Sequence, residues 1–521
     1  MNRRPSTLKL KSALIRSGLT APVEIEMRFV PGLPGILFLG LPDVSLKETA
    51  IRLRSAIRSA GFEIPRGKQL LVDISPRDEK KTAHGLDLAV CVGFLILSRQ
   101  IARSEWERVM LFGDIRLGGE VVAPDDWRKA QLLAEEEFVT GPLGPGVGEE
   151  YAAHMNQKTS RVVSISSIEE LKTFRLEAAV RSCDGPLLED RREGVFEDPS
   201  ESSRLGAWSQ ELRFTNEVSR LAALMALGGH PALLAGPPGT GKSTLARVVH
   251  AIRPKPTVAL SREILLWRTD DQSETKWGER PLLEPHHTTS QLAMVGGGRP
   301  VRAGVVTRAH GGTLLMDEVL LFRPEVQESL REPLETGMVK LARGTEWKGF
   351  PADFQLIGTT NLCACGKYTP DQPESCHCSS RLRSRFEDRL RGPFVDRFQI
   401  LSFTDRWRSE KAQVSLVEIH ERVRAGRKFQ MEKRGQLENR HWRPTDEEVR
   451  GVGSDSGGFS RLIAKNLASM TSERRRLAVF RVARTLADLD GAEAVREADF
   501  LEASRLAFES FQALYSGRGA P

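Results

Sequence analysis

Apolar positions along the chain alternate between strand spacing and helix spacing, and this pattern predicts an α/β protein. In the first 175 residues, short apolar runs bounded by turn residues predict strands at Gly32–Asp43 and Gln69–Ile74. Ser45–Ala60 has helical spacing, and Asp87–Ser98 is apolar enough for a buried helix. We therefore expect residues 1–175 to form one domain of alternating strands and helices.

The rest of the chain divides at a charged stretch. Residues 176–210 are poor in apolar side chains and rich in charge, which is typical of a linker. A second α/β domain is expected over 211–405, and a helical domain over 406–521. One helix of that last domain repeats apolar residues at i, i+3, i+4 and i+7. These residues are Val479, Val482, Ala483 and Leu486.

Length and composition add little to this division. A chain of 521 residues predicts three or four domains at about 150 residues each. The formal net charge of +7 leans toward an anionic partner. A solvated, charge-rich surface explains it as well.

Targeting signals and cysteine usage bear on the compartment. The longest apolar run, near Leu88–Leu97, is shorter than the roughly 20 residues of a membrane span, and the basic N-terminus lacks the apolar stretch of a signal peptide. Of six cysteines, four lie between Cys363 and Cys378, which argues against a disulfide framework. We expect a cytoplasmic protein with no membrane partner.

A glycine-rich segment carries the clearest chemical motif. It matches the Walker A pattern G-x-x-x-x-G-K-[ST], between an apolar strand at 231–235 and a helix at 243–252. Glycines let backbone N–H groups turn toward phosphates, and the helix N-terminus adds partial positive charge. We assign Lys242 to the β- and γ-phosphates of ATP and the Ser243 hydroxyl to Mg²⁺. The predicted nucleotide-binding residues are Gly236, Pro237, Pro238, Gly239, Thr240, Gly241, Lys242, Ser243 and Thr244.

Polar residues end two later strands. The apolar run from Gly312 ends in Asp317, suited to hold the Mg²⁺ shell, and Glu318, suited to polarise the attacking water. The run from Phe354 ends in Asn361. An asparagine there is commonly a strand-end cap. Its position after the other two motifs favours a catalytic role, orienting the water or touching the γ-phosphate.

These motifs, together with other ordered strings, resemble the magnesium-chelatase-like AAA+ family, the ComM/YifB group. The resemblance covers nearly the whole chain. The further strings are Gly32-Leu-Pro-Gly35, Gly40-Leu-Pro-Asp43, Pro285-His-His287, Met294-Val-Gly-Gly-Gly298, Leu330-Arg-Glu-Pro-Leu-Glu335, Gly392-Pro-Phe-Val-Asp-Arg397 and Val482-Ala-Arg-Thr-Leu-Ala-Asp488.

The resemblance implies a homo-hexameric ring with ATP sites between subunits. It places an arginine finger, which reaches the neighbouring subunit's site, at Arg397, and the second-sensor arginine of the helical lid at Arg474. Either arginine taken alone is better explained as a surface charge, and only its position in the order of the motifs favours the functional role. The sequence departs from the family where Arg397 is followed by Phe-Gln399 instead of Phe-Asp.

The first domain resembles the fold of the Lon protease domain. Aligned in this way, the protease's serine nucleophile falls at Asp87 and its lysine base near Arg128. A carboxylate is a poor substitute for the hydroxyl, and a guanidinium is not a base at neutral pH. We therefore expect an assembly or docking module without peptidase activity.

Two Cys-x-Cys pairs form a candidate metal site. Four thiolates suit tetrahedral Zn²⁺, although Cys-x-x-Cys is the commoner spacing, and four free thiols remain the alternative. Similar paired cysteines occur in many members of the resembled family. The residues are Cys363, Cys365, Cys376 and Cys378.

A basic hairpin is expected between the strands that end in Glu318 and Asn361. It reads as two short strands around Gly344, and related AAA+ helicases carry a pore-facing hairpin here. Its cations and one aromatic suit sequence-independent DNA binding. An edge hairpin whose lysines deter strand pairing is the alternative. The residues concerned are Lys340, Arg343, Trp347 and Lys348.

Three function classes compete. The favoured one is an ATPase motor that remodels branched or single-stranded DNA in helicase fashion, during recombination or DNA uptake. The alternatives are a metal-chelatase motor and a protein-remodelling motor. The N-terminal domain, which the chelatase motor subunit lacks, disfavours the first alternative. The substituted serine and lysine disfavour the second as a self-contained protease.

Overall fold

The chain divides into two compact units, Met1–Gly194 with Leu265–Ser273, and Val195–Ile264 with Glu274–Pro521. The linker expected over 176–210 lies outside the residues described here. This computed structural model describes residues 7–16, 19–39, 44–75, 84–103, 106, 108–125, 127–134, 137–142, 161–174, 212–268, 278–298, 301–343, 346–368, 375–390, 392–404, 407, 413–435, 438–442 and 472–515.

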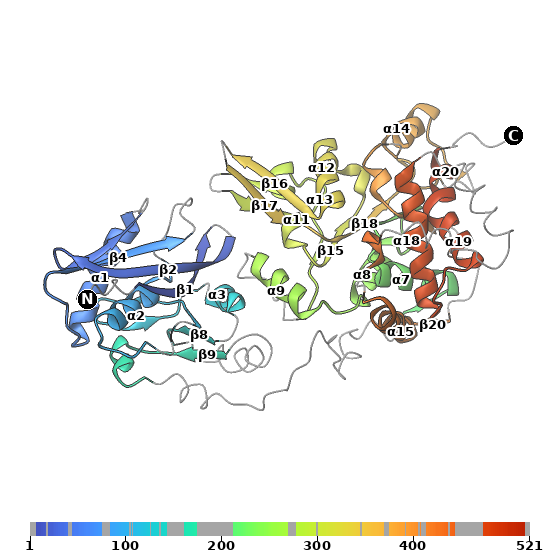
Figure 1. Cartoon of the computed structure of the whole chain (residues 1–521). Helices are drawn as coiled ribbons and strands as arrows, with labels where there is room; N and C mark the ends of the chain where they lie inside the picture. Colours follow the sequence, from blue (N-terminus) through green and yellow to red (C-terminus); the bar gives the residue numbers. More distant parts are fainter. Residues whose placement is uncertain are drawn as a thin grey trace. The chain divides into compact units, whose positions relative to one another are not determined.

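The first unit is built on a mixed seven-stranded sheet of order β3-β4-β2-β1-β5-β8-β9 (Figure 1). β1 and β2 form a long antiparallel hairpin, whereas β5, β8 and β9 run parallel. The strands are β1 (Leu8–Arg16), β2 (Leu19–Pro31), β3 (Gly35–Phe38), β4 (Lys68–Ser75), β5 (Val109–Leu111), β8 (Glu137–Thr140) and β9 (Arg161–Ser164), with β6 (Asp114–Ile115) and β7 (Val121–Val122) paired separately.

The helices of this unit lie where they were expected, but the order of elements at its N-terminus differs from the expected one. α1 (Val44–Ser59) and the almost wholly buried α2 (Asp87–Leu97) match the predicted helices. α3 (Trp127–Leu133) and the 3-10 helix η1 (Ile168–Lys172) complete the unit. The expected alternation of strands and helices is wrong at the N-terminus, where β1, β2 and β3 follow one another. Alternate residues of β2, among them Val23, Ile25 and Met27, are buried, which is the spacing of a half-buried strand.

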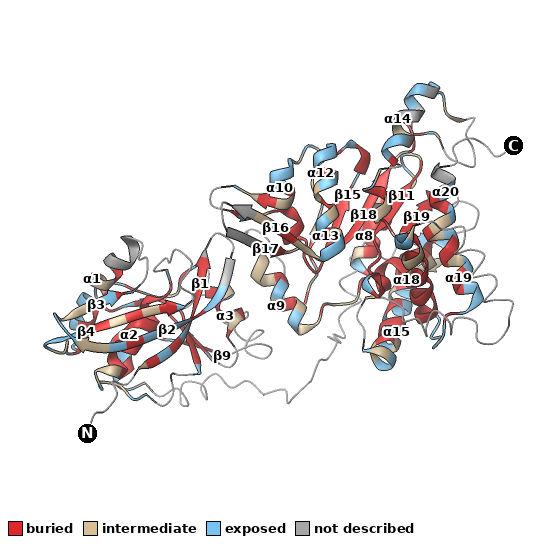
Figure 2. Ribbon diagram, turned by 45° about the horizontal axis from the view of Figure 1, so that its top comes forward, coloured by how far each residue is buried: buried red, intermediate tan, exposed pale blue. Residues whose placement is uncertain are grey.

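The second unit is built on a parallel five-stranded sheet of order β12-β15-β18-β11-β19. Four of its strands are buried along their whole length (Figure 2), which suits a parallel sheet covered on both faces. The strands are β11 (Ala232–Ala235), β12 (Leu282–Leu283), β15 (Thr313–Met316), β18 (Gln355–Thr360) and β19 (Ile400–Phe403). The fold is therefore α/β, as predicted.

Helices and small strand pairs surround this sheet. The helices are α7 (Asn216–Gly228), α8 (Lys242–Ala251), α9 (Val258–Trp267), α10 (Gln291–Val295), α11 (Val305–Arg308), α12 (Pro324–Ser329), α13 (Arg331–Thr336) and α14 (Ser380–Leu390), with 3-10 turns η3 (Val319–Leu321) and η5 (Val395–Arg397). The strand pairs are β10 (Arg213–Phe214) with β20 (Val414–Ser415), β13 (Gly296–Gly297) with β14 (Arg302–Ala303), and the expected hairpin of β16 (Met338–Arg343) and β17 (Glu346–Pro351).

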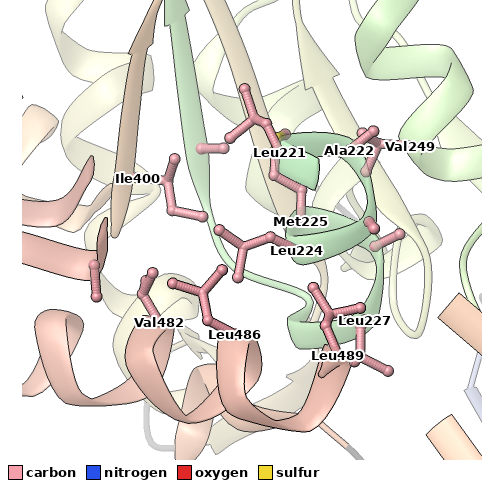
Figure 3. Close-up of a cluster of buried hydrophobic side chains, with 14 of the residues drawn as sticks. Leu221, Ala222, Leu224, Met225, Leu227, Val249, Ile400, Val482, Leu486 and Leu489 are labelled. Atoms are coloured by element: carbon pink, nitrogen blue, oxygen red, sulfur yellow. The ribbon is translucent and has the colours of Figure 1, made fainter. Parts of the chain in front are cut away.

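The C-terminal helices share a hydrophobic core with the sheet. Leu224 of α7 lies toward Ile400 of β19 and Leu486 of α18, and Met225 belongs to the same cluster (Figure 3). The helices are α15 (Leu416–Arg434), α18 (Glu473–Leu489), α19 (Glu497–Ser504) and α20 (Ser510–Tyr515), with the 3-10 turn η7 (Asn439–His441) and the π-helical turn η8 (Arg505–Glu509). Within the described residues, no helix combines the length and apolarity needed to cross a membrane.

A buried charge network also joins the helical part to the sheet. The Glu438 carboxylate is bonded by Arg253 at 2.7 Å, Arg440 at 3.0 Å and Arg280 at 3.3 Å. Burial alone would raise the pKa of Glu438, but the three guanidinium groups hold it well below its usual value. The network therefore fixes the end of α8 to the segment that follows α15.

Candidate active site

The glycine-rich loop leaves β11 at the carboxyl edge of the sheet and enters α8. Gly239 and Gly241 have φ values of +74° and +89°, which glycine adopts without strain. A Cβ atom on Gly236 would lie 2.1 Å from Thr404 Oγ1, so this position has no room for a side chain. Thr240 fixes the loop further, with its Oγ1 donating to Pro237 O at 2.9 Å. The loop and the first turn of α8 form a cradle of backbone N–H groups suited to phosphates.

Lys242 lies inside this loop and is almost fully buried. Its Nζ donates to Gly236 O and Pro237 O, both at 2.8 Å, and to Asn361 Oδ1 at 3.1 Å. Burial lowers the pKa of Lys242, and the nearby carboxylates of Glu318 and Asp317 act in the opposite direction. The ammonium group of Lys242, the one cation in the sequence of this loop, is thus held inside the loop by these carbonyl groups.

Ser243 and Asp317 meet across the carboxyl edge. Ser243 Oγ donates to Asp317 Oδ1 at 2.9 Å, and the Thr359 hydroxyl donates to the same oxygen. A hydroxyl beside a carboxylate is a donor set that fits Mg²⁺, which favours oxygen ligands. The structure therefore brings together the two predicted metal-holding residues, one from α8 and one from the end of β15.

Asn361 bridges the lysine and the second acid. Its Oδ1 accepts from Lys242, and its Nδ2 donates to Glu318 Oε1 at 2.7 Å. Glu318 itself has a left-handed backbone, at φ +51°, which is uncommon for a residue with a side chain. Its N–H donates to Thr359 Oγ1 at 3.0 Å, which holds this conformation. All the predicted polar residues at the strand ends therefore form one hydrogen-bonded group.

Arg397 and Arg474 lie elsewhere, near the amino ends of the strands. Both guanidinium groups bond Glu335 of α13, Arg397 at 2.7 Å, and Arg474 Nη1 also bonds Asp396 at 2.9 Å. They line a cavity of about 440 Å³. Pro231, just before β11, and Phe354, just before β18, line it too.

This placement separates the two arginines from the loop of their own chain. Parallel strands all run from the amino edge to the carboxyl edge, and the four residues of β11 span about 13 Å. Arg397 is almost fully buried, and its Nε has no hydrogen-bond partner within the described part of the chain. The arginine pair, bonded to Glu335 and Asp396, thus lies at the edge opposite the glycine-rich loop.

The four cysteines gather beside the nucleotide loop. Their Sγ atoms all lie within 4.8 Å of one another, with Cys363 and Cys365 at 3.3 Å and Cys365 and Cys376 at 3.7 Å. Tetrahedral Zn–S bonds of about 2.3 Å place sulfur atoms about 3.8 Å apart, which this cluster fits. The backbone N–H of Tyr368 donates to Cys363 Sγ at 3.3 Å, and that of Cys378 to Cys376 Sγ at 3.4 Å.

Asp87, at the position aligned with a protease serine, is fully buried at the start of α2. Arg52 bonds its Oδ2 at 2.7 Å, and the Ile115 N–H donates to the same oxygen at 3.1 Å. Burial raises the pKa of Asp87 to about 6, against the lowering effect of Arg52. Arg128 lies on α3 over the Trp127 ring. The cation that pairs with Asp87 is therefore Arg52, which sequence reasoning missed.

The basic hairpin carries four predicted DNA contacts. Lys340 on β16 is exposed, and the strand register pairs Leu341 with Lys348 and Ala342 with Trp347. The side chains of Arg343, Trp347 and Lys348 lie outside the described part of the structure.

Two further residues of the site carried no sequence signal that we used. Thr359 touches Asp317 and the Glu318 N–H, and Glu335 joins both arginines. The Thr-Thr-Asn ending of β18 could have indicated Thr359, because a threonine near a strand end can bond the strand beside it. Glu335 had no such signal, since its partners lie 62 and 139 positions away.

Three family models match most of the chain. They are described as magnesium chelatase, subunit ChlI, over residues 210–412, subunit ChlI of Mg-chelatase over 25–140, and magnesium chelatase, subunit ChlI C-terminal, over 414–506.

Individual relatives extend the similarity across both units. An uncharacterized protein YifB of Salmonella typhimurium is 31% identical over 382 residues, 73% of this chain and 72% of that protein. The competence protein ComM of Haemophilus influenzae is 28% identical over 501 residues, 93% of this chain and 94% of that protein. Lon protease 2 of Bacillus subtilis is 26% identical over 234 residues, 39% of each chain.

Proposed function

Because the chain belongs to the magnesium-chelatase-like ComM/YifB family of AAA+ proteins, we propose that it is an ATP-hydrolysing motor that acts on DNA as a homo-hexamer. The observation that carries the proposal is the hydrogen-bonded group at the carboxyl edge of the parallel sheet, formed by Lys242, Ser243, Asp317, Glu318 and Asn361.

Each member of this group has a separate task. Lys242 exchanges its carbonyl partners for β- and γ-phosphate oxygens, while the loop N–H groups hold the rest of the phosphate chain. Ser243 and Asp317 would hold Mg²⁺, which would supply positive charge to neutralise the phosphates. Glu318 accepts a proton from the attacking water, and Asn361 fixes the Glu318 carboxylate through its amide.

The positions of the two arginines are the reason to propose a second subunit at each ATP site. Arg397 and Arg474 lie at the amino edge, opposite the loop of their own chain, so the phosphates they meet belong to a neighbouring subunit. A guanidinium has the fixed charge and fork geometry for phosphate oxygens. Head-to-tail contacts of this kind generate rings when the rotation closes, which supports a closed ring; the number six comes from the family.

DNA is the substrate favoured by the hairpin and by one relative. The β16–β17 hairpin presents Lys340 to solvent, and Arg343, Lys348 and Trp347 belong to the same two strands. Cations follow phosphates regardless of sequence, and an aromatic ring stacks on any base. The relative named competence protein ComM supports a role in DNA uptake or recombination.

We also propose structural Zn²⁺ at the four cysteines. Tetrathiolate donors and the closeness of the sulfur atoms fit this ion. Purified protein dialysed against metal-free buffer should retain about one zinc per chain, and the Cys376→Ser protein should retain none. Cys91→Ala, which removes a buried thiol of α2, is the control.

The deciding experiment is the ATPase rate with and without candidate substrates. Single-stranded or branched DNA should raise the rate, whereas a porphyrin with Mg²⁺ and an unfolded protein should leave it unchanged. Stimulation by the porphyrin would favour the chelatase alternative, and stimulation by the protein would favour the remodelling alternative. No ATPase activity under any of these conditions would contradict the proposal.

A further inference from the structure

The four-cysteine loop is joined to the nucleotide site by two independent contacts. The first is covalent continuity, because Asn361 directly follows β18, and the buried Leu362 and Cys363 come next. The Asn361 side chain reaches both Lys242 and Glu318. Asn361 lies only two residues before Cys363. A shift of the backbone at Cys363 should therefore move the Asn361 amide, which bonds Glu318, the proposed catalytic acid.

The second contact runs from the tip of the same loop to the glycine-rich loop. Gly366 donates its N–H to Cys363 O at 3.1 Å, which closes a tight turn around the sulfur atoms. A Cβ on Gly366 would lie 2.7 Å from Pro238 Cδ. The turn thus lies directly against the nucleotide loop, with no room for even one methyl group between them.

The second Cys-x-Cys pair has weaker ties to this turn. Cys365 is exposed, and Cys376 and Cys378 come from a second segment, after residue 374. A metal bound by all four sulfurs ties this second segment to the turn. Without it, the described contacts that join the two Cys-x-Cys pairs are the 3.7 Å contact between Cys365 Sγ and Cys376 Sγ and backbone N–H bonds to the Cys365 and Cys378 sulfur atoms, all of them weak hydrogen bonds.

We infer that the metal held by Cys363, Cys365, Cys376 and Cys378 positions Asn361 and Pro238, so that occupancy of the cysteine site controls ATP turnover and nucleotide binding is sensed at the metal. The inference rests on the proposed ATPase function. Asn361 fixes Glu318, whereas the glycine-rich loop keeps its own hydrogen bonds. Loss of the metal should therefore lower kcat much more than it changes KM for ATP.

Gly366→Ala tests the contact without touching a metal ligand. The new methyl group collides with Pro238, and the φ of +74° adds backbone strain. Gly278→Ala is a matched control, because Gly278 has φ +79° and, within the described part of the chain, no atom lies within 4 Å of the place its new methyl group would take. Both proteins should keep about one zinc per chain. The Gly366→Ala protein should have a kcat at least tenfold below that of Gly278→Ala.

A spectroscopic experiment tests the reverse direction and needs no turnover. Co²⁺ bound by four thiolates absorbs visible light, and its bands respond to small changes in ligand geometry. Adding a non-hydrolysable ATP analogue with Mg²⁺ should shift these bands in the Co²⁺-loaded parental protein. The Lys242→Ala protein, loaded in the same way, should give no shift, because it lacks the lysine that holds the phosphates.

The outcomes separate this inference from the proposed function. A parental protein without ATPase activity contradicts the proposed function, and the Co²⁺ spectra still decide the coupling. Bands that do not respond to the nucleotide, or a Gly366→Ala rate within twofold of the Gly278→Ala rate, would overturn the inference. Protein from zinc-supplemented medium that holds no metal would overturn it too.

Discussion

Among single residues, Glu318 combines an uncommon backbone conformation with a chemical task. Its left-handed φ places the carboxylate beside Asn361, while its N–H is held by Thr359. Strained backbone of this kind persists where surrounding contacts hold it in place. Its neighbour Asp317 points instead to Ser243, so two consecutive acids serve two different partners.

Glu318→Gln should bind ATP and hydrolyse it poorly, because the metal-holding pair survives while the proton acceptor is lost. Lys242→Ala should lose tight nucleotide binding instead, since its charge meets the phosphates. Equilibrium binding of a fluorescent ATP analogue and phosphate release distinguish the two variants. A Glu318→Gln protein that turns over at the parental rate would show that another group activates the water.

Asp87 should make the first unit respond to mild acid. The folded pKa of about 6 lies above the unfolded value of about 3.9, so the folded state binds the proton more strongly between these values. The unit should therefore gain stability as pH falls from about 7 to 5, by roughly 1.3 kcal/mol. Asp87→Asn should lose this gain, and the exposed Asp125→Asn should keep it.

The measurement is hydrogen exchange of the α2 amides, corrected for intrinsic exchange at each pH. The same pH response in the parental and Asp87→Asn proteins would mean that Asp87 keeps its charge across this range.

Among elements, the joint between α8, the sheet and the lid depends on the buried Glu438 network. Glu438→Gln removes the carboxylate shared by three buried guanidinium groups, of which Arg440 still has Asp353 at 3.1 Å, and removing one partner of a buried ion pair costs about 3–5 kcal/mol. Glu432→Gln, at an exposed site on α15, should change stability by less than about 0.5 kcal/mol. Urea unfolding measures both. Equal midpoints would refute a structural role for the network.

The β16–β17 hairpin is the element proposed to hold DNA. Arg343→Ala with Lys348→Ala should weaken binding of single-stranded DNA and reduce the slope of log affinity against log salt by roughly 1.4, at about 0.7 per phosphate contact. Basal ATPase activity should remain. The control removes two exposed cations from α15 through Arg422→Ala with Lys428→Ala. DNA affinity that is unchanged over the salt titration would direct the search to residues 381–391.

Elements built from local apolar runs could be predicted from the sequence, and contacts between distant residues could not. β11, β15, β18 and α8 lie within two residues of the expected positions, because a buried parallel strand is a short apolar run between turns. The β1–β2 hairpin was missed, although the alternation in Val-Glu-Ile-Glu-Met of β2 indicates it.

The site residues also divide into those that a local motif predicts and those that depend on contacts between distant residues. The glycine-rich loop and the acids after β15 are defined by short motifs, and the structure places them in one group. The pairings of Asp87 with Arg52, Glu335 with two arginines and Glu438 with Arg253 join positions 35 to 185 residues apart. Charge alone does not select one arginine among the many in this chain.

For the whole molecule, we propose that each ATP site is formed by two subunits. One contributes the glycine-rich loop at the carboxyl edge of its sheet, and the other contributes Arg397 at the amino edge of its own. Arg397→Ala should abolish hydrolysis and leave ATP binding nearly intact, and an arginine finger contributes about 10³–10⁵ in rate. Mixing Arg397→Ala with Lys242→Ala subunits creates some interfaces with an intact loop and an intact finger. Those mixtures should regain ATPase activity. Mixtures as inactive as each variant alone would exclude action across an interface.

The placement of Arg397 and Arg474 opposite their own glycine-rich loop has a thermodynamic consequence. If the pair completes a neighbour's site, ATP binds more tightly to assembled subunits than to separate ones. Linkage is reciprocal, so nucleotide must then strengthen subunit association by the same factor. The apparent affinity for ATP would rise with protein concentration, and dilution alone would empty the sites. The concentration of this protein in the cell would then determine the ATP concentration at which its sites fill.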